Sequence, residues 1–174
     1  MKKIIIPAVL AILAAAGCSS APTIATVSGV DIKRFMGDWY VIANIPTFLE
    51  KDAYNAVESY RLNHDGTVAT TFTFRKGGFD GPVKTYHPKG FIRDHATNAV
   101  WDMRFVWPLK SEFLIIYLNE DYTVTVIGRS KRDYVWIMAR KPEIPGPEYR
   151  RILDLLAAAG YDISKIKKVP QRHD

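Results

Sequence analysis

Only one cysteine, Cys18, occurs in the 174 residues of the chain. An intrachain disulfide is therefore impossible, and no cysteine is available as a nucleophile in the domain that follows. The four histidines lie far apart in sequence and form no metal-ligand pattern, so we expect no metal site. The sequence also contains no Gly-x-Ser-x-Gly elbow, and its glycine-rich stretch at 77–81 is typical of a hairpin loop rather than a phosphate-binding turn. These absences argue against an enzyme and against a bound cofactor.

The N-terminal segment is a targeting signal. After Lys2 and Lys3, the apolar run at 4–16 is too short to span a bilayer comfortably, and small residues lead directly into Cys18. This pattern resembles the lipobox of bacterial lipoproteins. The resemblance implies a signal peptide at 1–17, a lipidated Cys18, a tether at 18–29 and, because Ser19 follows the cysteine, a lipid anchor on the periplasmic side of the bacterial outer membrane. The alternative is an ordinary secretory signal that leaves a free thiol.

The charge of the chain is only moderately basic. It has 24 Lys and Arg against 18 Asp and Glu, and the signal segment removes Lys2 and Lys3 from that excess. The remaining cations are scattered, with a cluster at 165–172. Such a surface suits contact with anionic lipid, and we expect no nucleic-acid partner.

The rest of the chain is a series of β-type runs separated by turn residues. We predict strands at 38–44, 55–63, 67–75, 83–92, 98–105, 112–119, 123–129 and 134–140. Eight sequential antiparallel strands can close into an up-and-down β-barrel, whose interior is filled by side chains or holds one small ligand. One helix follows, opened by Gly146-Pro147 and ended by Gly160, with an apolar stripe to pack on the outside of the barrel. The tail at 161–169 can add a short edge strand.

Three short motifs point to a family. The segment at 31–43 contains Gly37-Asp38-Trp39, Asp121-Tyr122 stands before the seventh predicted strand, and Arg140 ends the eighth. Together they resemble the signatures of the lipocalin family. With the lipobox and the segment at 134–142, the chain is similar to bacterial outer-membrane lipocalins related to apolipoprotein D. The resemblance covers about 30–169 and implies one all-β lipocalin domain at 30–174 that binds an apolar ligand.

Strand direction places the family motifs at one end of the barrel. Because direction alternates, the start of the first strand, the loop between the sixth and seventh, and the end of the eighth share one rim. We therefore predict a structural closed end, with the guanidinium of Arg140 over the indole of Trp39 and a charge-assisted hydrogen bond accepted by the carboxylate of Asp121. The predicted closed-end residues are Gly37, Trp39, Asp121 and Arg140.

The opposite rim is then the mouth of a cavity. Its loops carry apolar tips, of which we select Phe48, Tyr54 and Trp107. If Arg140 points inward, strand alternation also points Met138, Trp136 and Tyr134 inward. Further candidates on other strands are Phe72, Phe74, Met103, Phe105 and Tyr117. A register slip of one residue reverses any of these assignments.

These features favour a binding protein. We expect it to store or transport a fatty acid such as palmitate, or a lysophospholipid, as a monomer or weak homodimer. One alternative is a structural or interaction lipoprotein whose barrel is filled by its own side chains. Another is a lipid-modifying enzyme, which predicts a polar, titratable cluster inside the barrel, and the sequence indicates none.

Overall fold

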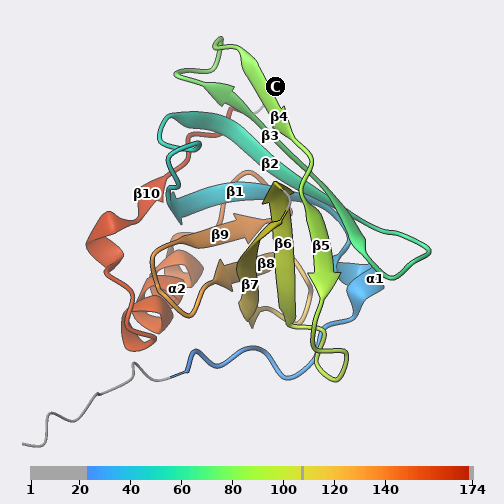
Figure 1. Cartoon of the computed structure of the whole chain (residues 1–174). Coiled ribbons are helices and arrows are strands. Elements are labelled where there is room, and N and C mark those ends of the chain that lie inside the picture. Colours follow the sequence, from blue (N-terminus) through green and yellow to red (C-terminus); the bar gives the residue numbers. More distant parts are fainter. Residues whose placement is uncertain (1–22, 107, 173–174) are drawn as a thin grey trace, which may run out of the picture.

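The computed structural model describes residues 23–106 and 108–172 as a single closed sheet with one helix outside it (Figure 1). The sheet is antiparallel, and β1 pairs with β9 as well as β2, which closes the barrel. The predicted eight-stranded barrel is confirmed, with β4 and β5 together forming its fourth strand. The strands are β1 (Gly37–Ile45), β2 (Ala53–Leu62), β3 (Val68–Lys76), β4 (Val83–Tyr86), β5 (Lys89–Ile92), β6 (Val100–Val106), β7 (Leu109–Leu118), β8 (Val124–Gly128), β9 (Val135–Ala139) and β10 (Lys167–Lys168).

The fourth strand is interrupted, although we predicted it as continuous over 83–92. Both β4 and β5 pair with β3, and the break between them contains Pro88. Proline has no N–H to donate to the ladder. Its carbonyl oxygen still accepts a hydrogen bond from the N–H of Thr70 at 3.1 Å, so the chain keeps its course along β3.

The C-terminal part packs on the outside of the barrel. Helix α2 (Gly146–Ala158) buries Ile152 and Leu156 in a core that it shares with the outer faces of the strands. It ends as predicted, because Gly160 has a φ of +86°, which favours glycine. After the short 3-10 helix η1 (Ile163–Lys165), β10 pairs with the part of β1 that lies far from α1 (Figure 1).

The tether is bound to the barrel along its described length. Ile24 is buried in the outer core, the N–H of Val27 donates to the carbonyl of Ile115, and that of Val30 donates to Thr97. The chain then enters helix α1 (Ile32–Phe35). Residues 1–22, with the predicted signal peptide and the lipidation site Cys18, lie outside the described residues. In the described part of the chain, no helix has the length and hydrophobicity to cross a bilayer.

The interior of the barrel is filled near α1. Five rings pack there with neighbouring centroids 4.9–6.0 Å apart. They belong to Phe35, Trp39, Tyr60, Trp101 and Phe113. All are buried, so this half of the barrel is solid and any ligand space lies in the other half.

Candidate functional site

Arg140 closes the filled end of the barrel. Its guanidinium lies 3.8 Å from the ring centroid of Trp39, and it donates five hydrogen bonds of 2.8–3.3 Å to main-chain carbonyls. The acceptors belong to Arg34, Phe35, Met36, Asp38 and Tyr122. Gly37 leaves room for this arrangement, because it has a φ of +94° and a Cβ there would lie 3.3 Å from Nη1 of Arg140. One side chain thus joins α1, β1, β9 and the β7–β8 loop.

Asp121 does not take the place we predicted for it. Its side chain is exposed, and none of the hydrogen bonds of Arg140 within the described chain reaches it. Its neighbour Tyr122, in a left-handed conformation with φ of 58°, turns toward the closed end instead. The hydroxyl of Tyr122 accepts the N–H of Asp31 at 2.8 Å, and its ring lies under the guanidinium of Arg34. The loop therefore contributes a ring and a carbonyl rather than a carboxylate.

A cavity of about 360 Å³ opens at the other end of the barrel. A smaller hollow of about 30 Å³ continues it inward, since the two share Glu58, Phe72, Phe105, Ser111 and Trp136. The wall of the larger one is mostly apolar and aromatic. Its lining residues are Thr47, Phe48, Leu49, Glu50, Glu58, Phe72, Phe105, Leu109, Ser111, Arg129, Tyr134 and Trp136.

The structure brings most of the selected ligand residues to this cavity. Trp136, Tyr134, Phe72 and Phe105 line it, and Met103 lines its inner extension. Phe105 is 51% exposed and lies at the rim rather than at depth. Two other candidates, Met138 and Phe74, are buried within the inner core and support the wall without lining it.

Tyr117, which we predicted to line the cavity, faces the outside. The β7–β8 register shifts between Ile115 and Tyr117, so Ile116 and Tyr117 both pack in the outer core. The hydroxyl of Tyr117 donates to Glu148 of α2 at 3.4 Å. A bulge of one residue reverses the alternation beyond it, and this is the physical reason for the error.

The three residues that we predicted at the mouth have different outcomes. Phe48 is 76% exposed and lines the opening, together with Leu109. Tyr54 instead packs its ring against Phe79, at 5.1 Å between centroids, and faces a separate groove beside β10. Trp107 lies outside the described residues.

A titratable cluster lines the cavity, contrary to our expectation of none. Glu58 and Glu50 line it, and Tyr60, on the same face of β2 as Glu58, lies below in the filled half, from where its hydroxyl donates a hydrogen bond to the Glu58 carboxylate. Burial raises the pKa of Glu58 from 4.5 to about 7, the hydrogen bond from Tyr60 opposes this rise, and the charge of Glu50 adds to it. The alternation of β2 placed Glu58 on the face of Tyr60, and that signal was available in the sequence.

Glu50 connects the β1–β2 loop to the cavity wall. Its carboxylate accepts the indole N–H of Trp136 at 2.7 Å, and the N–H and hydroxyl of Thr47 at 3.0 and 2.6 Å. The side chain is only 6% exposed. These bonds fix the loop that carries Phe48 against β9, so the opening has a defined edge.

We expect the substitution Glu58→Gln to stabilise the protein at alkaline pH. A carboxyl whose pKa rises on folding, here from 4.5 to about 7, costs stability as pH increases through that interval, because the unfolded chain ionises first. The free energy of unfolding of Glu58→Gln relative to the unsubstituted chain should therefore rise by about 2–3 kcal/mol between pH 4.5 and 8. Urea titrations at several pH values measure this difference, and a pH-independent difference contradicts the assignment.

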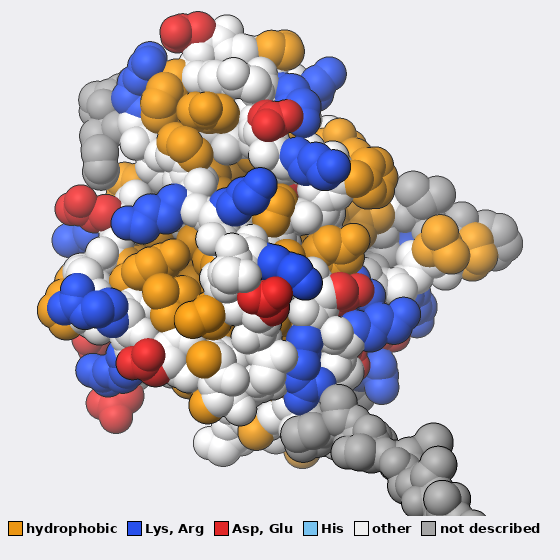
Figure 2. Space-filling view, turned by 90° about the vertical axis from the view of Figure 1, so that its left-hand side faces the viewer, with side chains coloured by type: hydrophobic (Ala, Val, Ile, Leu, Met, Phe, Trp, Pro, Cys, Tyr) orange, Lys and Arg blue, Asp and Glu red, His pale blue; other side chains and the backbone are white. Residues whose placement is uncertain are grey.

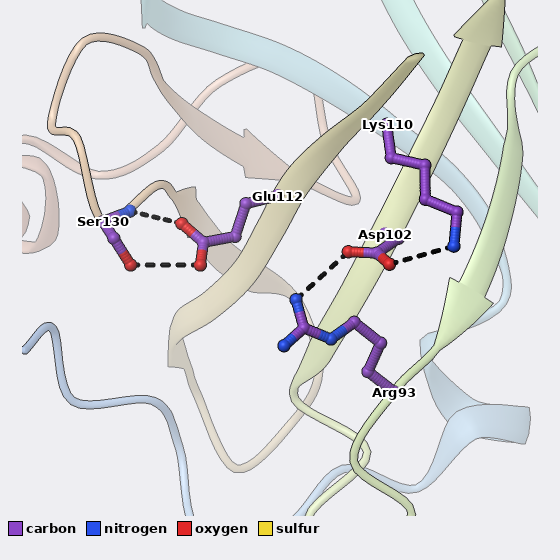
Figure 3. Close-up of polar contacts among 5 residues, drawn as sticks. All are labelled: Arg93, Asp102, Lys110, Glu112 and Ser130. Carbon is purple, nitrogen blue, oxygen red and sulfur yellow. Dashed lines mark hydrogen bonds and ion pairs between the residues drawn. The ribbon is translucent and has the colours of Figure 1, made fainter. Parts of the chain in front are cut away.

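Polar contacts fix two further parts of the barrel wall (Figure 3). The carboxylate of Glu112 on β7 accepts the N–H and the hydroxyl of Ser130, at 2.6 and 3.0 Å, in the loop after β8. Asp102 on β6 forms ion pairs with Arg93 and Lys110, at 3.2 and 3.3 Å. No group of three or more potential metal-ligating side chains was found in the described ranges.

Arg129 is the cation of the cavity wall. Its guanidinium forms an ion pair with Asp133 at 3.3 Å and lies 5.3 Å from the ring centroid of Tyr134. Among described residues, its buried Nε has no hydrogen-bond partner. The hydroxyl of Tyr161 holds the main chain of Arg129 in place by accepting its N–H and donating to its carbonyl. The guanidinium of Arg129, with one N–H that has no partner among the described residues, therefore lies beside the opening.

The comparisons with known proteins agree with this architecture. Temperature-induced lipocalin-1 of Arabidopsis thaliana is 31% identical over 157 residues, covering 83% of this chain and 81% of that protein. Outer membrane lipoprotein Blc of Citrobacter freundii is 28% identical over 174 residues, covering 96% and 97%. The structure of the cockroach allergen Per a 4 has a TM-score of 0.64 at 18% identity, covers 88% of this chain and 96% of its own, and shows the fold alone.

The family match spans nearly the whole described barrel. The sequence family described as "Lipocalin-like domain" matches residues 30–171, from the residue before the α1 cap to the segment after β10. Lipocalins are in general small binding proteins for hydrophobic ligands. This protein is a member of the lipocalin family.

Proposed function

We propose that this lipocalin reversibly binds a single-chain lipid, a fatty acid such as palmitate or a lysophospholipid, and stores or transports it. The observation that carries the proposal is the apolar cavity of about 360 Å³ that opens at the end away from Arg140. Small-ligand sites typically measure about 300–1,000 Å³, so this one suits one acyl chain better than two.

The chemistry of the wall supports an acyl ligand. Each buried methylene contributes about 0.8 kcal/mol, and the rings of Phe72 and Trp136 offer the apolar surface for it. The ordering of the chain and the loss of rigid-body freedom remove much of this gain, which leaves micromolar affinity or somewhat better. The lipid tail points inward, and an anionic head group at the rim meets Arg129.

We also propose that the protein is anchored to the bacterial outer membrane through acyl chains on Cys18. The small residues before that cysteine support this, as does the similarity to a relative that is named an outer membrane lipoprotein. Multiple acyl chains are needed for a stable anchor, because one gives only marginal membrane binding.

The cluster of Glu58 and Tyr60 favours a second candidate, a lipid-modifying enzyme. A carboxyl with a pKa of about 7 is suited to general acid–base work. It also suits a carrier, since a protonated carboxyl is less costly to cover with an acyl chain than an ionised one. Mass spectrometry of lipid recovered after incubation separates the two, because a carrier returns it unchanged and an enzyme returns a product.

Titration of tryptophan emission with palmitate and with a lysophospholipid tests binding. In a Trp107→Phe background, which removes the tryptophan predicted at the mouth, we expect a saturable change that arises from Trp136 and is lost when Trp136→Phe is added, since Trp39 and Trp101 are fully buried below the cavity. A fluorescent fatty acid bound to either protein should be displaced by palmitate. No saturable change together with no displacement removes the proposal.

A further inference from the structure

The open end of the barrel exposes three large apolar side chains. Phe48 of the β1–β2 loop is 76% exposed, Leu109 at the start of β7 is 72% exposed, and Phe105 near the end of β6 is 51% exposed. All three line the same opening. Scattered exposed apolar residues need no explanation, whereas a group around one opening indicates an interaction surface.

Cations surround this apolar group. Lys51 and Lys131 lie in the two loops that flank β1 and β9 at this end, and β10 brings Lys167 and Lys168 beside Ala43 and Asn44. Figure 2, which views the molecule from the left of Figure 1, shows hydrophobic side chains gathered between Lys and Arg side chains. Within the described chain, Lys51, Lys131 and Lys167 form no ion pair.

The acidic side chains divide between the two ends. At the open end, the exposed carboxylates are already paired, Asp52 with Lys76, Asp133 with Arg129 and Asp80 with Arg172. Several others lie in the loops of the closed end, namely Asp65, Asp94, Glu120 and Asp121. The open end is therefore the positive end of the molecule, and two copies placed mouth to mouth would repel each other.

The tether enters the fold on the side of the open end. Thr23 and Arg132 line one groove between α2 and the barrel, and Arg132 belongs to the β8–β9 loop at the rim. From there the tether runs past Ile115 to Thr97 at the closed end. Cys18 is five residues before Thr23, a reach of at most about 18 Å. An anchor on Cys18 therefore holds the open end, rather than α1, close to a bilayer.

We propose that the open end docks on an anionic lipid bilayer, with Phe48, Phe105 and Leu109 at the interface and the surrounding lysines over the head groups. Apolar insertion and attraction of basic residues to anionic lipid act together at such surfaces. The cavity then opens directly toward the membrane, so a lipid can pass between the two without crossing water. The role of this surface in lipid exchange rests on the proposed lipid-binding function. The docking itself does not depend on that function, because it is inferred from the exposed side chains and their charges.

The test places an environment-sensitive dye at either end of the lipidated protein. Leu109→Cys labels the open end, and Glu120→Cys labels an exposed position in the β7–β8 loop at the closed end. The unsubstituted chain, treated in parallel, reports any dye that reaches Cys18. On vesicles containing phosphatidylglycerol, the dye at 109 should shift to the blue and brighten severalfold, while the dye at 120 should not. Phosphatidylcholine vesicles, or high salt, should weaken the response.

Charge reversal supplies the matched control. Lys51→Glu with Lys131→Glu should reduce the response of the dye at 109, whereas Lys33→Glu with Lys141→Glu, an equal change at the closed end, should leave it intact. Equal responses at both dye positions overturn the inference, as does a blue shift that depends on protein concentration without vesicles. Displacement of a fluorescent fatty acid by palmitate, measured in the same preparations, reports lipid binding independently of docking. If the protein binds palmitate but does not dock on vesicles, only this inference is removed. If it docks on vesicles but does not bind palmitate, only the proposed function is removed.

Discussion

Replacement of Arg140 by alanine should destabilise the barrel by about 3–5 kcal/mol, because it leaves several main-chain carbonyls without their donors. The guanidinium bonds five carbonyl oxygens and covers the indole of Trp39 at 3.8 Å. Among the described residues, no other side chain forms hydrogen bonds with α1, β1 and the β7–β8 loop at the same time. Urea denaturation followed by circular dichroism measures the effect.

A second arginine at the same end provides the control. Arg34 lies 4.1 Å from the ring centroid of Tyr122 and bonds one carbonyl, that of Glu120, but its side chain is exposed. Arg34→Ala should therefore cost about 1 kcal/mol or less. Arg140→Lys keeps the charge but not the planar fork of donors, and should recover only a minor part of the loss. If Arg140→Ala is no worse than Arg34→Ala, the closed end does not depend on this side chain.

Chain direction explains why the closed end could be predicted from the sequence. In an up-and-down barrel the ends of alternate strands must share a rim, so Trp39 at the start of β1 and Arg140 at the end of β9 meet without any knowledge of side-chain contacts. The same rule placed Phe48 at the opposite rim. Regular alternation also gave Trp136 and Phe72 their inward direction, because β9 and the middle of β3 have no bulge.

Irregular backbone explains what could not be predicted. The bulge before Tyr117 and the left-handed Tyr122 each redirect a side chain, and no residue pattern marks either position. Glu50 lies in a loop, so its bond to Trp136, 86 residues away, depends on the final path of that loop. The interruption of the fourth strand at Pro88, by contrast, could have been predicted from the sequence, because proline has no N–H to donate to the ladder.

Introduction of a bulky ring at Ser111 should abolish most lipid binding while the barrel stays folded. Ser111 pairs with Met103, faces inward and lines both the cavity and its inner extension. In Ser111→Phe the ring occupies the space of about three methylenes, which is worth about 2.4 kcal/mol and corresponds to a loss of roughly 60-fold in affinity. Displacement of a fluorescent fatty acid by palmitate measures the loss.

The control is Ser111→Ala, which removes the hydroxyl but leaves the cavity open and should bind palmitate within about twofold of the unsubstituted chain. Both variants should unfold cooperatively, because the ring enters an existing space rather than a packed core, where overpacking costs about 1–3 kcal/mol. Unchanged affinity in Ser111→Phe, with a folded barrel, places the lipid somewhere other than between Trp136 and Phe72. Equal losses in both variants would instead assign the effect to the hydroxyl, so only the difference between phenylalanine and alanine at this position reports on the cavity itself.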